Sequence, residues 1–354
     1  MSNRREFLKS FSQLFVGSTL LAGGINSIAQ PSRREVLLNG RRIKTIDIHA
    51  HLVVPDVAEL LINTPFNEIS FAPWQALNAD RLDLMDQRGI DIQALSINRY
   101  WWYAADRDLA ASVVKLHDEY LGAWVKQHPD RFVALSSVAL QYPDLAANQL
   151  EYAVNELGHR GASIGGHVLG SNLSDPKYDV FWAKAEELQA PIFMHPDGAK
   201  NVIKEGSLSG RGELNNIIGN PLETTIFLSH LIYGGVFDRF PNLKVVAAHG
   251  GGYMPSYIGR SEVACQVRPN ADCLNEKNPS DYLREQIFVD TIVFDHEGLR
   301  HLVATVGSSQ VVYGTDAPFN WPDSIDTVMT SPSLNNSEKE AILGGNLGRL
   351  LKIE

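Results

Sequence analysis

The sequence has 354 residues, 44% of them hydrophobic, and a formal net charge of -10 at pH 7. This composition is typical of a globular chain with a large core, built as one barrel domain or as two smaller domains. The acidic balance argues against a nucleic-acid partner, because phosphate binding requires clustered lysine and arginine.

Residues 1–29 resemble a twin-arginine signal peptide that precedes a single domain at residues 30–354. Arg4 and Arg5 are followed by a weakly apolar stretch at residues 14–28, and residues 27–29 have the small-x-small pattern of a cleavage site. The stretch is too short and too polar to form a stable membrane anchor. We therefore expect export of the folded protein to the periplasm.

The chain has two cysteines, Cys265 and Cys273. An oxidising periplasm would allow them to pair, although they are too close in sequence to hold distant parts of the fold together. No third thiol or nearby histidine joins them, so we interpret them as structural or inert and not as metal ligands.

From residue 43 onward, short apolar runs alternate with helical patterns, which indicates parallel strands joined by crossover helices. Helical spacing of apolar residues is seen at residues 107–127, 144–157 and 178–189. Eight strands are predicted, at residues 44–49, 91–97, 132–138, 161–167, 191–195, 243–249, 286–290 and 311–316. Eight such units predict an α/β fold, the (β/α)8 or TIM barrel.

Two connections are longer than the others, at residues 50–80 after the first strand and at residues 196–220 after the fifth. Long strand-to-helix loops on a barrel commonly form lids or substrate walls at the catalytic face. We expect these two loops to border the active site.

We single out the polar residues that end five of the predicted strands, where a barrel places its chemistry. These residues are His49, His167, His195, His249 and Asp316. His51 lies two residues beyond His49, and the period of two along a strand would turn both imidazoles to the same face. An exposed loop with two solvated histidines is the alternative for that pair alone, but the other strand-end histidines favour a metal site.

Seven segments of the sequence resemble the metal-dependent amidohydrolase superfamily, in the branch of aminocarboxymuconate-semialdehyde decarboxylase. They lie at residues 47–51, 85–89, 164–167, 193–196, 221–225, 248–252 and 314–319. The resemblance covers nearly the whole chain after residue 29. It implies that His49, His51, His195 and Asp316 bind one divalent ion, zinc or alternatively manganese, and three imidazoles with one carboxylate suit zinc.

The same resemblance assigns further roles in the site. It implies that His249 is a catalytic acid or base that does not bind the metal. If the enzyme is a hydrolase, we expect Asp316 to shuttle protons together with His249. The resemblance also implies that Arg260 reaches into a second subunit's site to hold a substrate carboxylate, and therefore that the protein is a homodimer. His167 and Arg99 are further candidates for substrate binding, although Arg99 could equally be a surface residue packed beside aromatic side chains.

These assignments leave two enzymatic functions open. The resemblance favours a non-oxidative decarboxylase, a carbon–carbon lyase that acts on a small planar unsaturated or aromatic carboxylic acid. The alternative is a metal-dependent hydrolase of a lactone, amide or ester, which would use the same ligands. A periplasmic metal-binding or solute-binding protein is a third reading, and it would leave the acid–base residues without a role.

Overall fold

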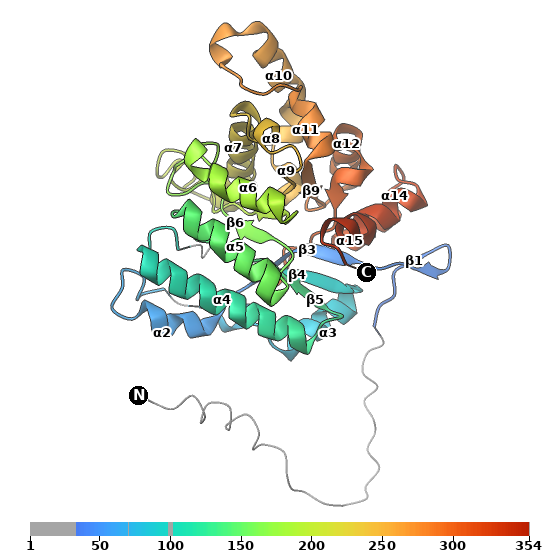
Figure 1. Cartoon of the computed structure of the whole chain (residues 1–354). Helices are drawn as coiled ribbons and strands as arrows, with labels where there is room; N and C mark the ends of the chain where they lie inside the picture. The colour runs from blue at the N-terminus through green and yellow to red at the C-terminus, as the bar shows by residue number, and fades with distance from the viewer. Residues whose placement is uncertain (1–32, 70, 98–101, 354) are drawn as a thin grey trace, which may run out of the picture. The chain divides into compact units, whose positions relative to one another are not determined.

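The computed structural model describes residues 33–69, 71–97 and 102–353 (Figure 1). The predicted signal peptide and Arg99 lie outside these residues. A short antiparallel pair, β1 (Leu37–Leu38) and β2 (Arg41–Arg42), comes before the barrel strands. None of the described helices is both long enough and apolar enough to cross a membrane.

The eight barrel strands pair in parallel within two sheets. The first sheet contains β3 (Ile46–Leu52), β4 (Ile92–Ile97) and β5 (Phe132–Ala134). The second contains β6 (Ala162–Ile164), β7 (Ile192–Met194), β8 (Val245–Ala247), β9 (Ile287–Asp290) and β10 (Val311–Val312).

Single parallel bridges join the edges of the two sheets. Ser136, just after β5, pairs with Ala162 of β6, and Ala50 of β3 pairs with Ala317, which follows β10. The strands occur where the sequence predicts them, in the order of a (β/α)8 barrel. Most are shorter than predicted, whereas β3 continues to Leu52 and so contains both His49 and His51.

Helices follow the strands, and α4, α5 and α6 lie outside them in chain order (Figure 1). The structure confirms residues 107–127 as a helix, which begins after Asp106, whose carboxylate accepts the Leu109 N–H. The helices are α2 (Ala58–Leu61), α3 (Ala79–Arg88), α4 (Arg107–Gln127), α5 (Pro143–Leu157), α6 (Asp179–Glu187), α7 (Asn220–Tyr233), α8 (Val236–Arg239), α9 (Ala248–Gly251), α10 (Met254–Val267), α11 (Pro279–Glu285), α12 (His296–Val306), α13 (Ser324–Thr330), α14 (Asn336–Glu340) and α15 (Asn346–Leu350).

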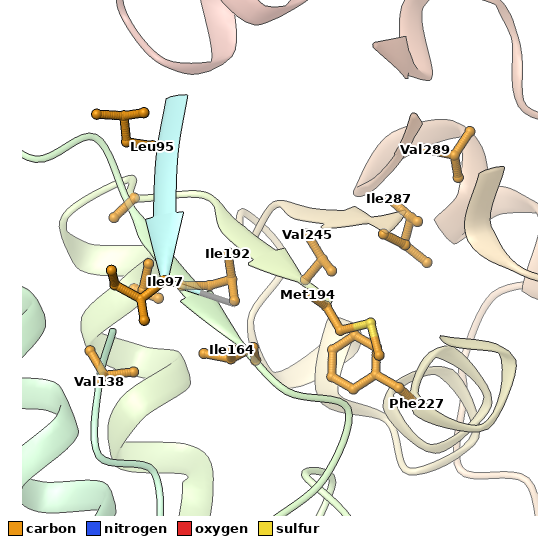
Figure 2. Close-up of a cluster of buried hydrophobic side chains, with 14 of the residues drawn as sticks. Leu95, Ile97, Val138, Ile164, Ile192, Met194, Phe227, Val245, Ile287 and Val289 are labelled. Carbon is orange, nitrogen blue, oxygen red and sulfur yellow. The ribbon is translucent and has the colours of Figure 1, made fainter. Parts of the chain in front are cut away.

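The strand side chains alternate between two apolar clusters. Ile192 and Met194 of β7 belong to a large cluster that includes helix residues such as Phe227 (Figure 2). Phe193, between them, belongs to a second cluster with Val246 of β8 and Ile48 of β3. Because this second cluster joins side chains of strands that are not neighbours, it fills the inside of the barrel.

Strand β3 departs from strict alternation. Its pairing with β4 shifts register between Asp47 and Ala50. Ile48 therefore packs in the inner cluster while the next residue, His49, also faces inward, with its ring 5.1 Å from the ring of Phe193. Such a bulge re-aims a side chain, and here it turns a histidine toward the carboxyl ends of the strands.

Candidate metal centre and active site

Three of the predicted metal ligands meet at the carboxyl ends of the strands, together with His249, which was predicted as an acid or base and not as a ligand. His49, His195, His249 and Asp316 each offer one donor atom, and these atoms all lie within 4.8 Å of one another. His51 joins them, because its Nε2 lies 3.0 Å from Nε2 of His49 and 2.6 Å from Oδ1 of Asp316. The expectation that His49 and His51 face the same way is confirmed.

Asp290, the last residue of β9, fixes one of these ligands. Its Oδ2 lies 2.7 Å from Nδ1 of His49, so that nitrogen donates to the carboxylate and Nε2 faces the cluster. Its Oδ1 accepts the Gly250 N–H at 2.9 Å, one residue after His249. Asp290 also ends a predicted strand, but no role was predicted for it from the sequence.

Asp47 holds the backbone beside the cluster. It is fully buried and accepts the His49 N–H at 2.9 Å. It also accepts hydrogen bonds from the Thr315 hydroxyl at 2.6 Å, the Thr315 N–H at 3.1 Å and the Gln93 side-chain amide at 2.8 Å. Asp47 thus ties β3 to the segment that carries Asp316, and burial raises its pKa against these hydrogen bonds.

The electrostatics of the cluster suit a cation. Burial holds the pKa of His195 well below its usual value and lowers the pKa of His51 to about 4, so both rings are neutral ligands at pH 7. Burial acts in the same direction on His49, but Asp316 and Asp290 outweigh it and raise its pKa to about 10. The negative charges of the two carboxylates therefore stabilise a positive charge among these rings.

A divalent metal ion fits this donor set. Neutral imidazoles and a carboxylate, converging from separate strand ends, are the ligands that catalytic divalent ions use. The Asp290 contact to His49 is the outer hydrogen bond that orients a metal-bound histidine.

His249 occupies a backbone position that few residues adopt. Its φ is 55° and its ψ 50°, and the next three residues, Gly250, Gly251 and Gly252, also have positive φ. A Cβ atom at Gly252 would lie 2.2 Å from the Pro221 carbonyl oxygen, which only glycine avoids. The three glycines therefore allow the backbone to pack closely against α7. Their positive φ angles also turn the chain away from His249.

The loop after His195 is held by the first turn of α7. Three consecutive N–H groups, of Asp197, Gly198 and Ala199, donate to its side chains. Glu223 Oε2 accepts two of them, both at 2.9 Å, and Asn220 Oδ1 accepts the Gly198 N–H at 2.8 Å. Glu223 lies in one of the segments that resemble the family, residues 221–225, and no role was predicted for it from the sequence.

A cavity of about 640 Å³ opens onto the cluster. Its described lining has aromatic, amide and carboxylate side chains and contains no lysine or arginine. The lining residues are His51, His195, Pro196, Asp197, Gly198, Glu213, Asn215, Asn216, Asn220, Asp316, Phe319, Asn320 and Trp321. Of the two loops predicted to border the active site, residues 196–220 supply seven of these positions, whereas residues 50–80 supply only His51.

The family model described as amidohydrolase matches residues 46–353. The chain is also 31% identical over 298 residues to 2-amino-3-carboxymuconate-6-semialdehyde decarboxylase of Dictyostelium discoideum, covering 82% of this chain and 80% of that relative. The chain belongs to the amidohydrolase family. This confirms the family that the sequence motifs indicate.

Two further comparisons agree with this assignment. Gamma-resorcylate decarboxylase of Rhodococcus jostii is 26% identical over 333 residues, 87% of this amidohydrolase and 98% of the relative. A 5-carboxyvanillate decarboxylase of Novosphingobium aromaticivorans, solved with manganese and 4-hydroxy-3-methoxy-5-nitrobenzoic acid, has a TM-score of 0.78 at 20% identity and covers 92% of this chain and 100% of that one. The structural likeness shows the fold.

The predicted substrate-binding residues lie apart from one another. Arg260 is exposed on α10, which projects away from the strands (Figure 1), and it does not line the cavity at the cluster. His167 lines a separate cavity with Glu223.

Cys265 and Cys273 form a disulfide at the end of α10, with a Cα–Cα distance of 5.8 Å, and neither belongs to the metal cluster.

Proposed function

We propose that this amidohydrolase is a metal-dependent, non-oxidative decarboxylase of a small planar aromatic or unsaturated carboxylic acid. The observation that carries the proposal is the convergence of His49, His51, His195 and Asp316 at one end of the barrel, with His249 beside them. The two relatives described above are both named as decarboxylases of such acids, which supports this reaction over hydrolysis.

The chemistry can be assigned to the residues of the site. A divalent ion, which we propose to be zinc with manganese as the alternative, would act as a Lewis acid on a substrate oxygen. The carbon–carbon bond to the carboxylate breaks, carbon dioxide leaves, and the electron pair stays on the ring or alkene carbon. His249, whose pKa is lowered by burial, would take up a proton from solvent and deliver it to that carbon. Its buried Nδ1 makes no hydrogen bond with a described residue.

The charge of the cavity limits the substrate. Its described lining includes Asp197 and Glu213 but no cationic side chain. A substrate carboxylate therefore needs the metal ion and a cation from elsewhere, and a second carboxylate would meet like charge. We propose a monocarboxylic acid whose hydroxyl or carbonyl oxygens accept hydrogen bonds from the amide groups of residues such as Asn220.

The missing cation supports the proposal that the protein is a homodimer in which Arg260 enters the partner's site. Arg260 lies on the same helix as three large exposed apolar side chains, Tyr257, Val263 and Val267, which are 62%, 54% and 64% exposed. Clustered apolar residues of this kind are typical of protein–protein interfaces. An arginine among them would be placed to cross such an interface.

Turnover in heavy water tests the reaction. A decarboxylase leaves one carbon-bound deuterium in the product and releases an equal amount of carbon dioxide, whereas a hydrolase places solvent oxygen in a new carboxylate and releases no gas. We expect the first result with hydroxybenzoates or muconate semialdehydes as substrates. His249→Ala should slow the reaction by about 100-fold or more while the metal stays bound. Oxygen-18 incorporation without gas would instead establish the hydrolase.

A further inference from the structure

A second cavity, of about 230 Å³, lies beside the metal-centre cavity, and Asp197 borders both. Its walls are mostly apolar. The residues that line it are Phe66, Ile69, Trp102, Tyr103, Ala104, Gly165, His167, Leu169, Asp197, Lys200, Asn201 and Glu223. The metal cluster contributes none of them, so this cavity is a separate site.

His167 presents a fixed hydrogen-bond donor in this cavity. The Gly170 N–H donates to His167 Nδ1 at 3.1 Å, so Nδ1 is an acceptor and the ring proton lies on Nε2. Burial lowers the pKa of His167, although the Lys200 carbonyl and Asp197 oppose the shift, and the ring is neutral at pH 7.

The Nε2–H group of His167 has no hydrogen bond to a described residue, although the side chain is only 10% exposed. Leaving a buried donor unpaired is costly, so such a group usually marks the place of a ligand or a water molecule. Oε1 of Glu223 lies 4.0 Å from Nε2, which is too far for a hydrogen bond, and the Lys200 carbonyl, although close enough to raise the pKa of the ring, does not meet hydrogen-bond geometry with Nε2 either.

Glu223 offers an acceptor on the other side of this gap. Its Oε2 is occupied by two loop N–H groups, whereas Oε1 receives only the Gly166 N–H, at 3.2 Å. A group placed between His167 Nε2 and Glu223 Oε1 would have to accept one hydrogen bond and donate another. A hydroxyl group does both.

We infer that this cavity binds a phenol, with the hydroxyl group between His167 and Glu223 and the ring against the aromatic wall. The edge-to-face pair of Phe66 and Trp102, with ring centroids 5.5 Å apart at 89°, supplies that wall. The volume is below the roughly 300–1,000 Å³ of drug-sized sites, so it suits a single ring.

The charges of the cavity favour a neutral phenol over a benzoate. Asp197 and Glu223 both border the ligand space, and Lys200 is the one cationic side chain among the described lining residues. A benzoate carboxylate here would lie beside Asp197 and beside Glu223, whose pKa burial raises to about 7, in a poorly hydrated place that disfavours a further negative charge. Phenol binding at this cavity requires neither metal nor turnover and is therefore independent of the proposed reaction.

Binding of phenol, with benzoate as the comparison, can be measured by calorimetry or ligand-observed NMR on the metal-loaded protein. We expect saturable phenol binding that His167→Phe weakens by about tenfold or more, since one hydrogen bond and the space beside it are lost. Ile69→Trp places a larger side chain in the wall of the cavity and should weaken phenol binding by a similar factor. This variant tests the site independently if His167→Phe does not fold. His296→Phe, an exposed substitution on α12, is the matched control.

The variant His195→Ala separates this site from the metal centre. It should lose metal yet bind phenol as the wild type does, whether or not the protein is a decarboxylase. Phenol binding that survives both His167→Phe and Ile69→Trp, that disappears in His195→Ala, or that is weaker than benzoate binding would overturn the inference. The first result would leave a buried water molecule as the partner of His167.

Discussion

Asp290 Oδ2 lies 2.7 Å from Nδ1 of His49, and both side chains are fully buried. The same carboxylate also accepts the Gly250 N–H, next to His249. One residue at the end of β9 therefore orients a metal ligand and the backbone that carries the proposed acid–base group. Asp290 is in this sense the structural link between metal binding and proton transfer.

Replacement of Asp290 should weaken metal binding. We expect Asp290→Ala to lower metal affinity by about 10–100-fold, because His49 loses the partner that sets its tautomer and ring orientation. Competition with a chromogenic chelator measures this affinity. Asp272→Ala, on the exposed segment after α10, is the control. Unchanged affinity in Asp290→Ala would mean that the contact does not orient the ligand.

Direct removal of a ligand should have a larger effect. We expect about one divalent ion per subunit by elemental analysis, and His195→Ala should lose both the ion and the activity. A chelator should inactivate the wild type, and adding back zinc or manganese should show which ion restores the higher rate. Full activity in a metal-free preparation would refute the proposed mechanism.

The contacts of Glu223 predict a graded response to substitution. Glu223→Ala removes three hydrogen bonds that hold Gly166 and the loop after His195, so we expect kcat/KM to fall by about tenfold or more in a folded protein. Glu223→Gln keeps one oxygen for the loop and should be closer to the wild type. Glu205→Ala, an exposed substitution in the loop after His195, is the control. Equal losses in the alanine and glutamine variants would argue against this positioning role.

Asp118 on α4 should make stability depend on pH. Burial raises its pKa to about 7, although the Ser136 hydroxyl donates to it at 2.6 Å. The unfolded carboxyl titrates near 3.8, so the folded state keeps a proton that the unfolded state has lost. This contribution to the free energy of unfolding is therefore complete below about pH 3.8 and is lost as the pH rises to about 7.

Urea unfolding at several pH values between 4 and 8 tests the role of Asp118. Asp118→Asn cannot titrate, so its free energy of unfolding should fall less over this range than that of the wild type. Asp108→Asn, an exposed substitution on the same helix, is the matched control. Parallel pH profiles for the wild type and Asp118→Asn would show that another group dominates.

Arg260 tests the proposed dimer. We expect Arg260→Ala to bind metal normally but to raise KM, because the substrate carboxylate loses its cationic partner. Mixing it with His195→Ala subunits should restore part of the activity, since one of the two sites then receives both an intact metal centre and an arginine. Arg268→Ala, also exposed at the end of α10, is the control. Verified mixed dimers without activity would place Arg260 outside the partner's site.

The sequence by itself determined the barrel and the identity of its strand-end residues. The alternation of apolar runs with helical patterns predicted the eight strands in order. Strands of a parallel sheet are buried on both faces and therefore consist of such apolar runs. The position of His49, His195 and Asp316 at the ends of these runs predicted their meeting, since parallel strands end at one face. A local pattern suffices for these conclusions.

Tertiary structure decided which residues support the site. Asp290 contacts His49 across 241 positions of sequence, and Glu223 reaches back to the loop after His195. In the second cavity, the Gly170 N–H sets the tautomer of His167, and residues from several loops form the walls. Hydrogen bonds and cavities of this kind arise from the packing of distant segments, so no periodicity or spacing in the chain specifies them.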